Sequence, residues 1–272
     1  MNRKEQRFVA TVRRYYEAHG RDELPWRKTS DPYSITVSEI MLQQTQVERV
    51  VPKYKAFLES FPTVEALAAA PLASVLQLWQ GLGYNRRAKF LHQCAKAVVS
   101  EWGGTFPTTY QELQSLPGVG PYTAGAVMAF AYNEAVPILE TNIRTAVVYH
   151  FYPDEAAVSE VELLHCVTKT IDATNPREWY WALMDYGAHL KRTVGNLNKQ
   201  TKAYSKQSRF VGSDRQLRGQ IIELLRSAPY SPAELKKVLA AFKAEAIQVQ
   251  LRALETEGLI EKKQRVYQLP TS

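Results

Sequence analysis

The chain has little cysteine. Its 272 residues include only Cys94 and Cys166, and the two do not form a Cys-x-x-Cys pair. Two thiols do not supply a disulfide framework, a structural zinc site or an iron–sulfur cluster held by cysteines alone. We therefore expect a protein of a reducing compartment that holds no metal ion and no other cofactor.

Long hydrophobic runs are also missing. Residues 1–5 lead into a charged helical pattern instead of the apolar core of a signal peptide. No apolar run approaches the roughly 20 residues that a membrane-spanning helix needs. We expect a cytoplasmic protein that does not associate with a membrane.

Basic residues exceed acidic ones. The sequence contains 34 Lys and Arg against 27 Asp and Glu, which gives a net charge of +7. This excess favours a polyanionic partner, although a charge spread so widely is also typical of a soluble protein. The length suggests a main body with a smaller module.

Helical spacing of apolar residues dominates, and the alternation typical of strands is scarce. Proline, glycine and threonine separate the helical stretches at short intervals. We expect Asp31 to cap the second helix, with Pro32 in its first turn. The predicted helices cover residues 5–18, 35–47, 50–59, 64–69, 72–79, 85–101, 110–113, 123–132, 142–151 and 158–172. These helices predict an all-α body over residues 1–191.

The composition changes after this body. Residues 192–213 contain several basic side chains and no acidic one, which predicts a linker that is either a solvated loop or lies on an anion. Residues 214–272 read as helices at 217–227, from 231, and at 244–258, followed by a hairpin at 259–269. That order is typical of a winged-helix module, and such modules bind DNA or other proteins about equally well.

A glycine-punctuated turn, Leu116-Pro117-Gly118-Val119-Gly120, opens an apolar helix. The two glycines let backbone N–H groups approach a phosphate, and the start of the helix adds partial positive charge. An ordinary connection between two helices gives the same pattern.

Two glutamates are candidates for catalysis. Glu39 lies among apolar residues, and burial would raise its pKa and make it a general acid; a structural ion pair with Arg27 or Arg49 is the alternative. Glu140 follows a second apolar run. It either caps the next helix or faces a developing oxocarbenium ion as an ionised carboxylate. A neutral and an ionised carboxyl group together suit cleavage of a glycosidic bond.

Four motifs in order carry a family resemblance: Pro25-Trp26-Arg27, residues 37–47, residues 81–88 and the turn at 116–120. Together they resemble the helix-hairpin-helix DNA glycosylase superfamily, and most of all its adenine-specific mismatch glycosylases. The likeness runs from the first helix to about Leu190. It implies a two-lobed helical body that works as a monomer on double-stranded DNA with a mispaired or damaged base.

The resemblance also implies roles for residues. The catalytic residues would be Glu39, Tyr122 and Glu140. The pocket for a base flipped out of the stack would be lined by Trp26, Arg27, Leu42 and Trp181. Contacts to DNA would come from Gln44, Tyr84, Arg86, Gly118, Val119, Gly120 and Thr123, with Gln44 and Tyr84 wedged into the duplex and the hairpin on a phosphate.

Tyr122 bears on the type of reaction. Members of the superfamily that also cut the strand have a lysine there, because an amine is needed to form a Schiff base with the sugar. Tyrosine implies a monofunctional enzyme that leaves an abasic site. Its hydroxyl would bond near the catalytic carboxylate, or the ring would only pack the hairpin.

The chain departs from the family pattern in several places. Relatives usually have aspartate where Glu140 stands. The adenine enzymes commonly have glutamate or glutamine near the position of Trp181, and they carry a C-terminal domain of another type. Relatives commonly hold an iron–sulfur cluster through four cysteines. The corresponding segment here has Lys191, Asn198, Thr201 and Gln207.

Our sequence-based prediction is a cluster-free, monofunctional mismatch DNA glycosylase that removes adenine opposite guanine or 8-oxoguanine. One alternative is an enzyme that removes uracil or thymine from mispairs with guanine. Another is a DNA-binding protein without catalytic activity. The C-terminal module would bind DNA or recruit a protein partner.

Overall fold

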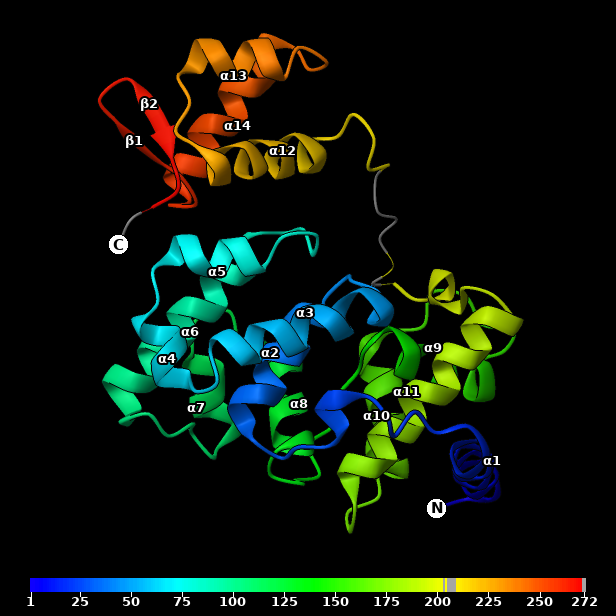
Figure 1. Cartoon of the computed structure of the whole chain (residues 1–272). Coiled ribbons are helices and arrows are strands. Elements are labelled where there is room, and N and C mark those ends of the chain that lie inside the picture. The colour runs from blue at the N-terminus through cyan, green and yellow to red at the C-terminus, as the bar shows by residue number, and fades with distance from the viewer. Residues whose placement is uncertain (203, 205–208, 271–272) are drawn as a thin grey trace. The chain divides into compact units, whose positions relative to one another are not determined.

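The protein is mostly helical, as the sequence predicted (Figure 1). The computed structural model describes residues 1–202, 204 and 209–270. The helices of the first part of the chain are α1 (Arg3–His19), η1 (Pro25–Arg27), α2 (Pro32–Leu42), α3 (Val47–Ser60), α4 (Val64–Ala69), α5 (Leu72–Leu78), α6 (Arg86–Trp102), α7 (Tyr110–Ser115) and α8 (Pro121–Phe130). Those that follow are α9 (Thr141–Phe151), α10 (Glu160–Thr170), α11 (Pro176–Thr193), η2 (Leu197–Gln200), α12 (Asp214–Ser227), α13 (Pro232–Val238) and α14 (Ala244–Thr256), with strands β1 (Glu261–Lys263) and β2 (Val266–Gln268).

Helix α2 begins as predicted but ends early. The side chain of Asp31 accepts a hydrogen bond of 2.9 Å from the N–H of Ser34, which caps the helix. The prediction that the helix runs to Val47 was wrong, because it ends at Leu42. The glutamines that follow therefore lie on a turn, where Gln44 has a φ of 55°.

Helix α11 has no counterpart among the predicted helices. Proline at its first position and Gly187 in its interior both look like helix breakers in the sequence. In the structure Pro176 occupies the first turn, where no N–H is needed, and the Asn175 side chain accepts a hydrogen bond from the N–H of Glu178. The helix then continues for 18 residues and forms much of the core.

The chain divides into two compact units. Unit 1 comprises Met1–Glu39, Thr108–Ser115 and Val119–Lys206; unit 2 comprises Ile40–Pro107, Leu116–Gly118 and Gln207–Ser272. Both units are thus assembled from segments far apart in the sequence. The predicted boundaries at residues 191 and 213 remain a prediction.

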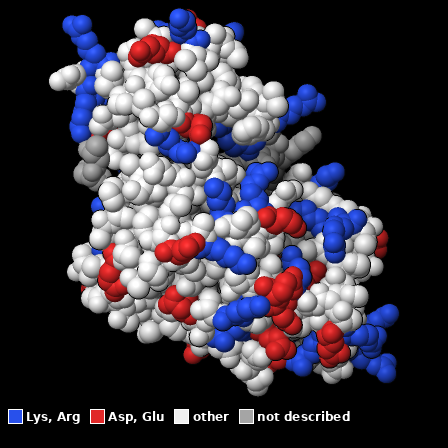
Figure 2. Space-filling model, in the orientation of Figure 1, with Lys and Arg blue, Asp and Glu red and all other residues white. Residues whose placement is uncertain are grey.

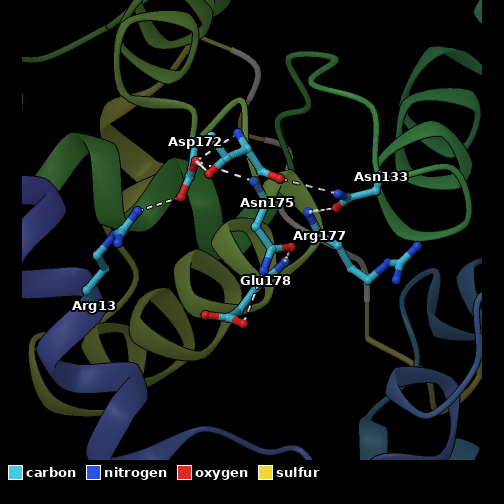
Figure 3. Close-up of polar contacts among 7 residues, drawn as sticks. Arg13, Asn133, Asp172, Asn175, Arg177 and Glu178 are labelled. Atoms are coloured by element: carbon cyan, nitrogen blue, oxygen red, sulfur yellow. Dashed lines mark hydrogen bonds and ion pairs between the residues drawn. The ribbon is translucent and has the colours of Figure 1, made fainter.

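In unit 1, α9 and α11 pack closely, and α1 lies against α11. A polar network fixes the start of α11 (Figure 3). Asp172 forms an ion pair with Arg13 of α1 and accepts a hydrogen bond of 2.9 Å from the N–H of Thr174. The side-chain oxygen of Asn133, in the segment after α8, accepts one of 3.2 Å from the N–H of Arg177. These bonds tie α1, α11 and the segment after α8 together.

In unit 2, α6 packs against α4 and α5, and large side chains such as Phe57, Leu67 and Trp79 are fully buried. The C-terminal part of the unit has α12, α13, α14 and the antiparallel pair β1–β2, in which Lys262 faces Tyr267. The predicted order of helices followed by a hairpin is confirmed. The choice between DNA and a protein as the partner of this part stays a prediction.

No helix in the described part of the chain is both long enough and apolar enough to cross a membrane.

Candidate active site

Glu39 lies in α2 with its side chain buried, at 6% exposure. Oε2 of its carboxyl group accepts a hydrogen bond of 2.9 Å from the hydroxyl group of Tyr122. None of the ion pairs between described residues involves Glu39, and Arg27 pairs with Asp185 instead. The alternative of a structural ion pair between Glu39 and Arg27 is therefore wrong.

The surroundings of Glu39 favour its protonated form. Burial raises its pKa from 4.5 to about 7, and the negative charge of Glu140 acts in the same direction, whereas the Tyr122 hydrogen bond acts against it. A carboxyl group with this pKa holds its proton close to neutral pH and can donate it. This is the property required of a general acid.

Tyr122 stands in the first turn of α8, directly after the glycine-punctuated turn. Burial raises the pKa of its hydroxyl well above the ordinary value, and the charges of Glu39 and Glu140 raise it further. The hydroxyl therefore remains protonated and acts as a hydrogen-bond donor. Tyr122 does more than pack the hairpin.

Glu140 is the N-cap of α9. Its Oε1 accepts hydrogen bonds of 2.8 Å from the N–H groups of both Asn142 and Ile143. The predicted capping role is confirmed, and the longer side chain of glutamate still reaches the helix start. Burial raises the pKa of Glu140, while the two N–H donors and the positive charges of Lys191 and Arg144 lower it. Burial has the larger effect, so the pKa of Glu140 is raised overall, although the donors and the helix dipole limit the rise.

Close packing brings these carboxyl groups into one region of unit 1. A Cβ atom added to Gly125 of α8 would lie 2.3 Å from Cγ2 of Ile138, so α8 contacts the segment that leads to Glu140. The hydroxyl group of Tyr180 in α11 accepts a hydrogen bond from the N–H of Ile138 and donates one to the Val136 carbonyl. A Cβ added to Gly187 would lie 2.0 Å from the backbone oxygen of Asn142. Only glycine lets α11 approach the start of α9 this closely.

Of the predicted base-pocket residues in unit 1, Arg27 and Trp26 are buried and Trp181 is half-buried. The Arg27 guanidinium donates two hydrogen bonds of 2.8 Å to the Asp185 carboxylate and stacks over the Trp181 ring at 5.4 Å. Burial alone would raise the pKa of Asp185, but Arg27 and Arg21 outweigh it and hold that pKa below its ordinary value. The pair therefore stays charged and fixes Arg27.

The remaining pocket residue, Leu42, belongs to unit 2, as do the predicted DNA contacts Gln44, Tyr84 and Arg86. Leu42 is half-buried, whereas Gln44 and Tyr84 are exposed. The Tyr84 hydroxyl accepts a hydrogen bond from Arg215 of α12. Arg86 is exposed, and its Nε lies 3.7 Å from an oxygen of Glu257, so an intramolecular acid competes with a phosphate for it.

The turn between α7 and α8 contains the predicted DNA contacts Gly118, Val119 and Gly120, and Thr123 follows in the first turn of α8. Gly118 and Gly120 are exposed, whereas the side chains of Val119 and Thr123 are buried. Gly118 has a φ of 75°, and a Cβ there would lie 2.5 Å from Cβ of Phe90. An anion at this turn would meet backbone groups and not the side chains of Val119 and Thr123.

The basic side chains on the face seen in Figure 2 do not form a single positively charged patch. Basic and acidic side chains are interspersed over much of that face. The net charge of +7 is therefore weaker support for a polyanionic partner than the backbone turn at residues 116–120.

Comparison with known proteins identifies the family. Residues 37–165 match the model of the HhH-GPD superfamily base excision DNA repair proteins, and this range includes Glu39, Tyr122 and Glu140. An adenine DNA glycosylase from Mycolicibacterium smegmatis is 37% identical over 264 residues, which cover 89% of each chain. The chain belongs to the HhH-GPD superfamily. A second adenine DNA glycosylase, from Mycobacterium tuberculosis, is 36% identical over 247 residues, 81% of this chain and 80% of that one.

Solved structures agree with this assignment. A thermostable thymine-DNA glycosylase matches with a TM-score of 0.61 and 28% sequence identity, over 69% of this chain and 87% of the other. The all-α body predicted from the sequence is thus an HhH-GPD fold.

This HhH-GPD protein has hydrogen-bonding residues where the resemblance places cluster cysteines. The buried Asn198 side chain donates hydrogen bonds to the Thr141 carbonyl at 3.2 Å and to the Thr145 hydroxyl at 3.0 Å. Thr201 is also buried and donates to the Asn198 carbonyl. The first part of the predicted basic linker is therefore packed on the start of α9. Gln207 lies outside the described residues, and those described include no group of three or more His, Cys, Asp or Glu side chains that could hold a metal ion.

Two residues of this HhH-GPD protein escaped the sequence reasoning. Asp185, the partner of Arg27, is 158 residues away from it, and no local pattern links the two. Arg87 was passed over for its neighbour Arg86. A signal existed, because Arg87 falls on the same helical face as the apolar Leu91 and Cys94, and an arginine on a buried face needs partners.

Proposed function

We propose that this HhH-GPD protein is a monofunctional DNA glycosylase that hydrolyses the N-glycosidic bond of adenine in a mispair with guanine or 8-oxoguanine. The observation that carries the proposal is the buried Glu39 carboxyl group, whose pKa of about 7 suits a proton donor and which senses the charge of Glu140. The names of the two mycobacterial relatives support adenine as the base.

The two carboxyl groups divide the reaction. Glu39 gives its proton to a ring nitrogen of the flipped base, so that the base leaves with the electron pair of the bond to the sugar. The sugar is left as an oxocarbenium ion, which the ionised Glu140 carboxylate stabilises. Water then adds to the sugar carbon and releases a proton, and the products are free base and an abasic strand.

Tyr122 supports hydrolysis without strand cleavage. Its hydroxyl orients the Glu39 carboxyl group through the 2.9 Å hydrogen bond. The side chain offers no amine for a Schiff base, so the sugar is attacked by water and the strand is not cut.

The DNA is held by backbone and by exposed side chains. In our proposal the N–H groups of the 118–120 turn grip a phosphate, and Gln44 and Tyr84 enter the duplex where the base leaves it. The protein acts as a monomer on duplex DNA at the nucleoid, in the cytoplasm.

A panel of duplexes tests the proposal. Otherwise identical duplexes carry adenine opposite guanine, adenine opposite 8-oxoguanine, uracil opposite guanine or thymine opposite guanine, and released base and strand integrity are measured. We expect free adenine and an uncut abasic strand. Release of no base from any duplex would refute the proposal.

Removal of uracil or thymine is the second candidate. It is favoured by the likeness to the thymine-DNA glycosylase and by the aromatic Trp181, near the position where the family resemblance leads us to expect glutamate or glutamine in an adenine enzyme. Release of uracil or thymine without adenine in the same panel would establish this candidate in place of the first.

A further inference from the structure

Arg87, in the first turn of α6, has an unusual set of partners. Among the described residues its guanidinium group donates hydrogen bonds to neutral acceptors alone. They are the carbonyls of Ile40 at 2.8 Å, Met41 at 3.0 Å, Gln43 at 2.6 Å, Leu82 at 3.0 Å and Gly83 at 3.0 Å, and the Thr45 hydroxyl at 3.2 Å. The residue is buried, with 9% of its surface exposed. None of the ion pairs between described residues includes it. A buried charge held only by neutral dipoles is costly to place, so its position needs a reason.

The acceptors come from two separate segments. The first is the end of α2 and the turn that follows it, where the last carbonyls of the helix have no partner within the helix. The second is the turn before α6, around Leu82 and Gly83. The Arg87 guanidinium group thus links the two segments through hydrogen bonds. The ring N–H of Trp79 donates a further hydrogen bond of 3.1 Å to the Gly83 carbonyl.

Each segment carries, next to a carbonyl that Arg87 holds, an exposed residue with an uncommon backbone conformation. Gln44 directly follows one carbonyl that Arg87 holds and has a φ of 55°; Tyr84 directly follows another and has a φ of 49°. Residues other than glycine rarely adopt this left-handed conformation, and it persists only when surrounding contacts enforce it. The Arg87 guanidinium also lies 5.6 Å from the centre of the Tyr84 ring.

We propose that Arg87 is a positioning residue that fixes Gln44 and Tyr84 as a preformed pair for entry into the DNA duplex. The inference rests on the proposed function, because that function gives these two side chains their place in the duplex. Arg87 does not touch the reacting atoms in this proposal. Its effect is on the step in which the base leaves the stack.

The variant Arg87→Lys tests this role. Lysine keeps the positive charge but has one nitrogen, which cannot reach both segments with the geometry of the guanidinium fork. We expect single-turnover adenine release from a mispaired duplex to slow by about 10- to 100-fold, because misplaced groups lose catalytic alignment. On a duplex in which adenine faces an abasic site, the defect should shrink to about threefold or less, because an unpaired base leaves the stack at lower cost.

Two further variants keep the test sharp. Arg177→Lys is the matched control, because Arg177 also donates to a backbone carbonyl, that of Ala131, but holds neither segment; it should release adenine at the parent rate. Thr45→Val removes one acceptor of Arg87 and should give a smaller defect with the same dependence on the substrate. If thermal melting shows that Arg87→Lys does not fold, the measurements on Thr45→Val test the role of Arg87 instead.

Duplex distortion separates this inference from the proposed function. In a Glu39→Gln background, fluorescence of 2-aminopurine at the target position reports unstacking without any chemistry. Arg87→Lys should reduce the fluorescence rise that accompanies binding. An unchanged rise, or a release defect of equal size on paired and unpaired adenine, would overturn the role of Arg87. Failure of the parent to release any base would refute the proposed function, and the fluorescence would still test Arg87.

Discussion

Glu39 and Glu140, the two candidate catalytic residues of unit 1, occupy different positions along their helices. Glu39 lies inside α2, away from the free N–H groups of the helix start, and its carboxyl group accepts a hydrogen bond from the Tyr122 hydroxyl group. Glu140 stands at the start of α9 and receives two N–H hydrogen bonds of 2.8 Å. Burial raises the pKa of both acids, and the comparison teaches that N–H donors at a helix start oppose this rise for Glu140, whereas a single hydroxyl donor opposes it for Glu39.

The largest expected effect is the loss of the Glu39 proton. Glu39→Gln removes the acid and keeps the size of the side chain, so we expect base release to slow by about 10²- to 10⁴-fold. Binding to the duplex should remain, as measured by anisotropy. The exposed Glu59 supplies a matched control, Glu59→Gln, which should behave as the parent. If Glu39→Gln releases base at the parent rate, Glu39 is not the proton donor, and the comparison with Glu140 loses its basis.

The next largest effect is expected at Glu140. Glu140→Gln removes the negative charge while its side-chain oxygen still caps α9, so base release should slow by about 10²- to 10³-fold with little change in melting temperature. Glu140→Asp keeps both the charge and a good cap, and should retain most of the activity. If Glu140→Gln is as active as the parent in single-turnover assays, Glu140 is a structural cap and nothing more.

Stability provides a measure that does not depend on DNA. Because the pKa of Glu39 is raised from 4.5 to about 7, the unfolded chain gives up this proton at lower pH than the folded chain does. The free energy of unfolding should therefore fall by about 3 kcal/mol between these pH values. Urea titrations across this range should show the fall in the parent and a smaller one in Glu39→Gln. If the free energy of unfolding changes equally with pH in both proteins, Glu39 has an ordinary pKa.

The smallest expected effect is a change in the pH dependence of base release when the Tyr122 hydrogen bond to Glu39 is removed. Base release should fall as pH rises through about 7, where Glu39 loses its proton. The Tyr122 hydrogen bond lowers that pKa, so Tyr122→Phe should raise it and move the basic limb of the pH–rate profile to higher pH. A shift to lower pH, measured under single-turnover conditions, would mean that the hydroxyl favours the protonated form instead.

Local signals predicted much of the site. Glu39 was found because an acid among apolar residues of one helix is itself a pattern, and Glu140 because it directly precedes a helix. The end of α2 was missed because Arg87, 45 residues beyond Leu42, binds its last carbonyls. The Arg27–Asp185 pair was missed for the same reason. Contacts between segments distant in the sequence have no local pattern, so they appear only when the chain is folded.

A direct titration of the carboxyl groups tests the central claim. Carbon-13 NMR of glutamate-labelled protein would follow each carboxyl group with pH, and the Glu39→Gln variant would assign the signal of Glu39. We predict one carboxyl group that titrates near pH 7, is absent from Glu39→Gln, and stays protonated while Glu140 is already ionised. A Glu39 signal that titrates near pH 4.5, together with its neighbours, would contradict the account.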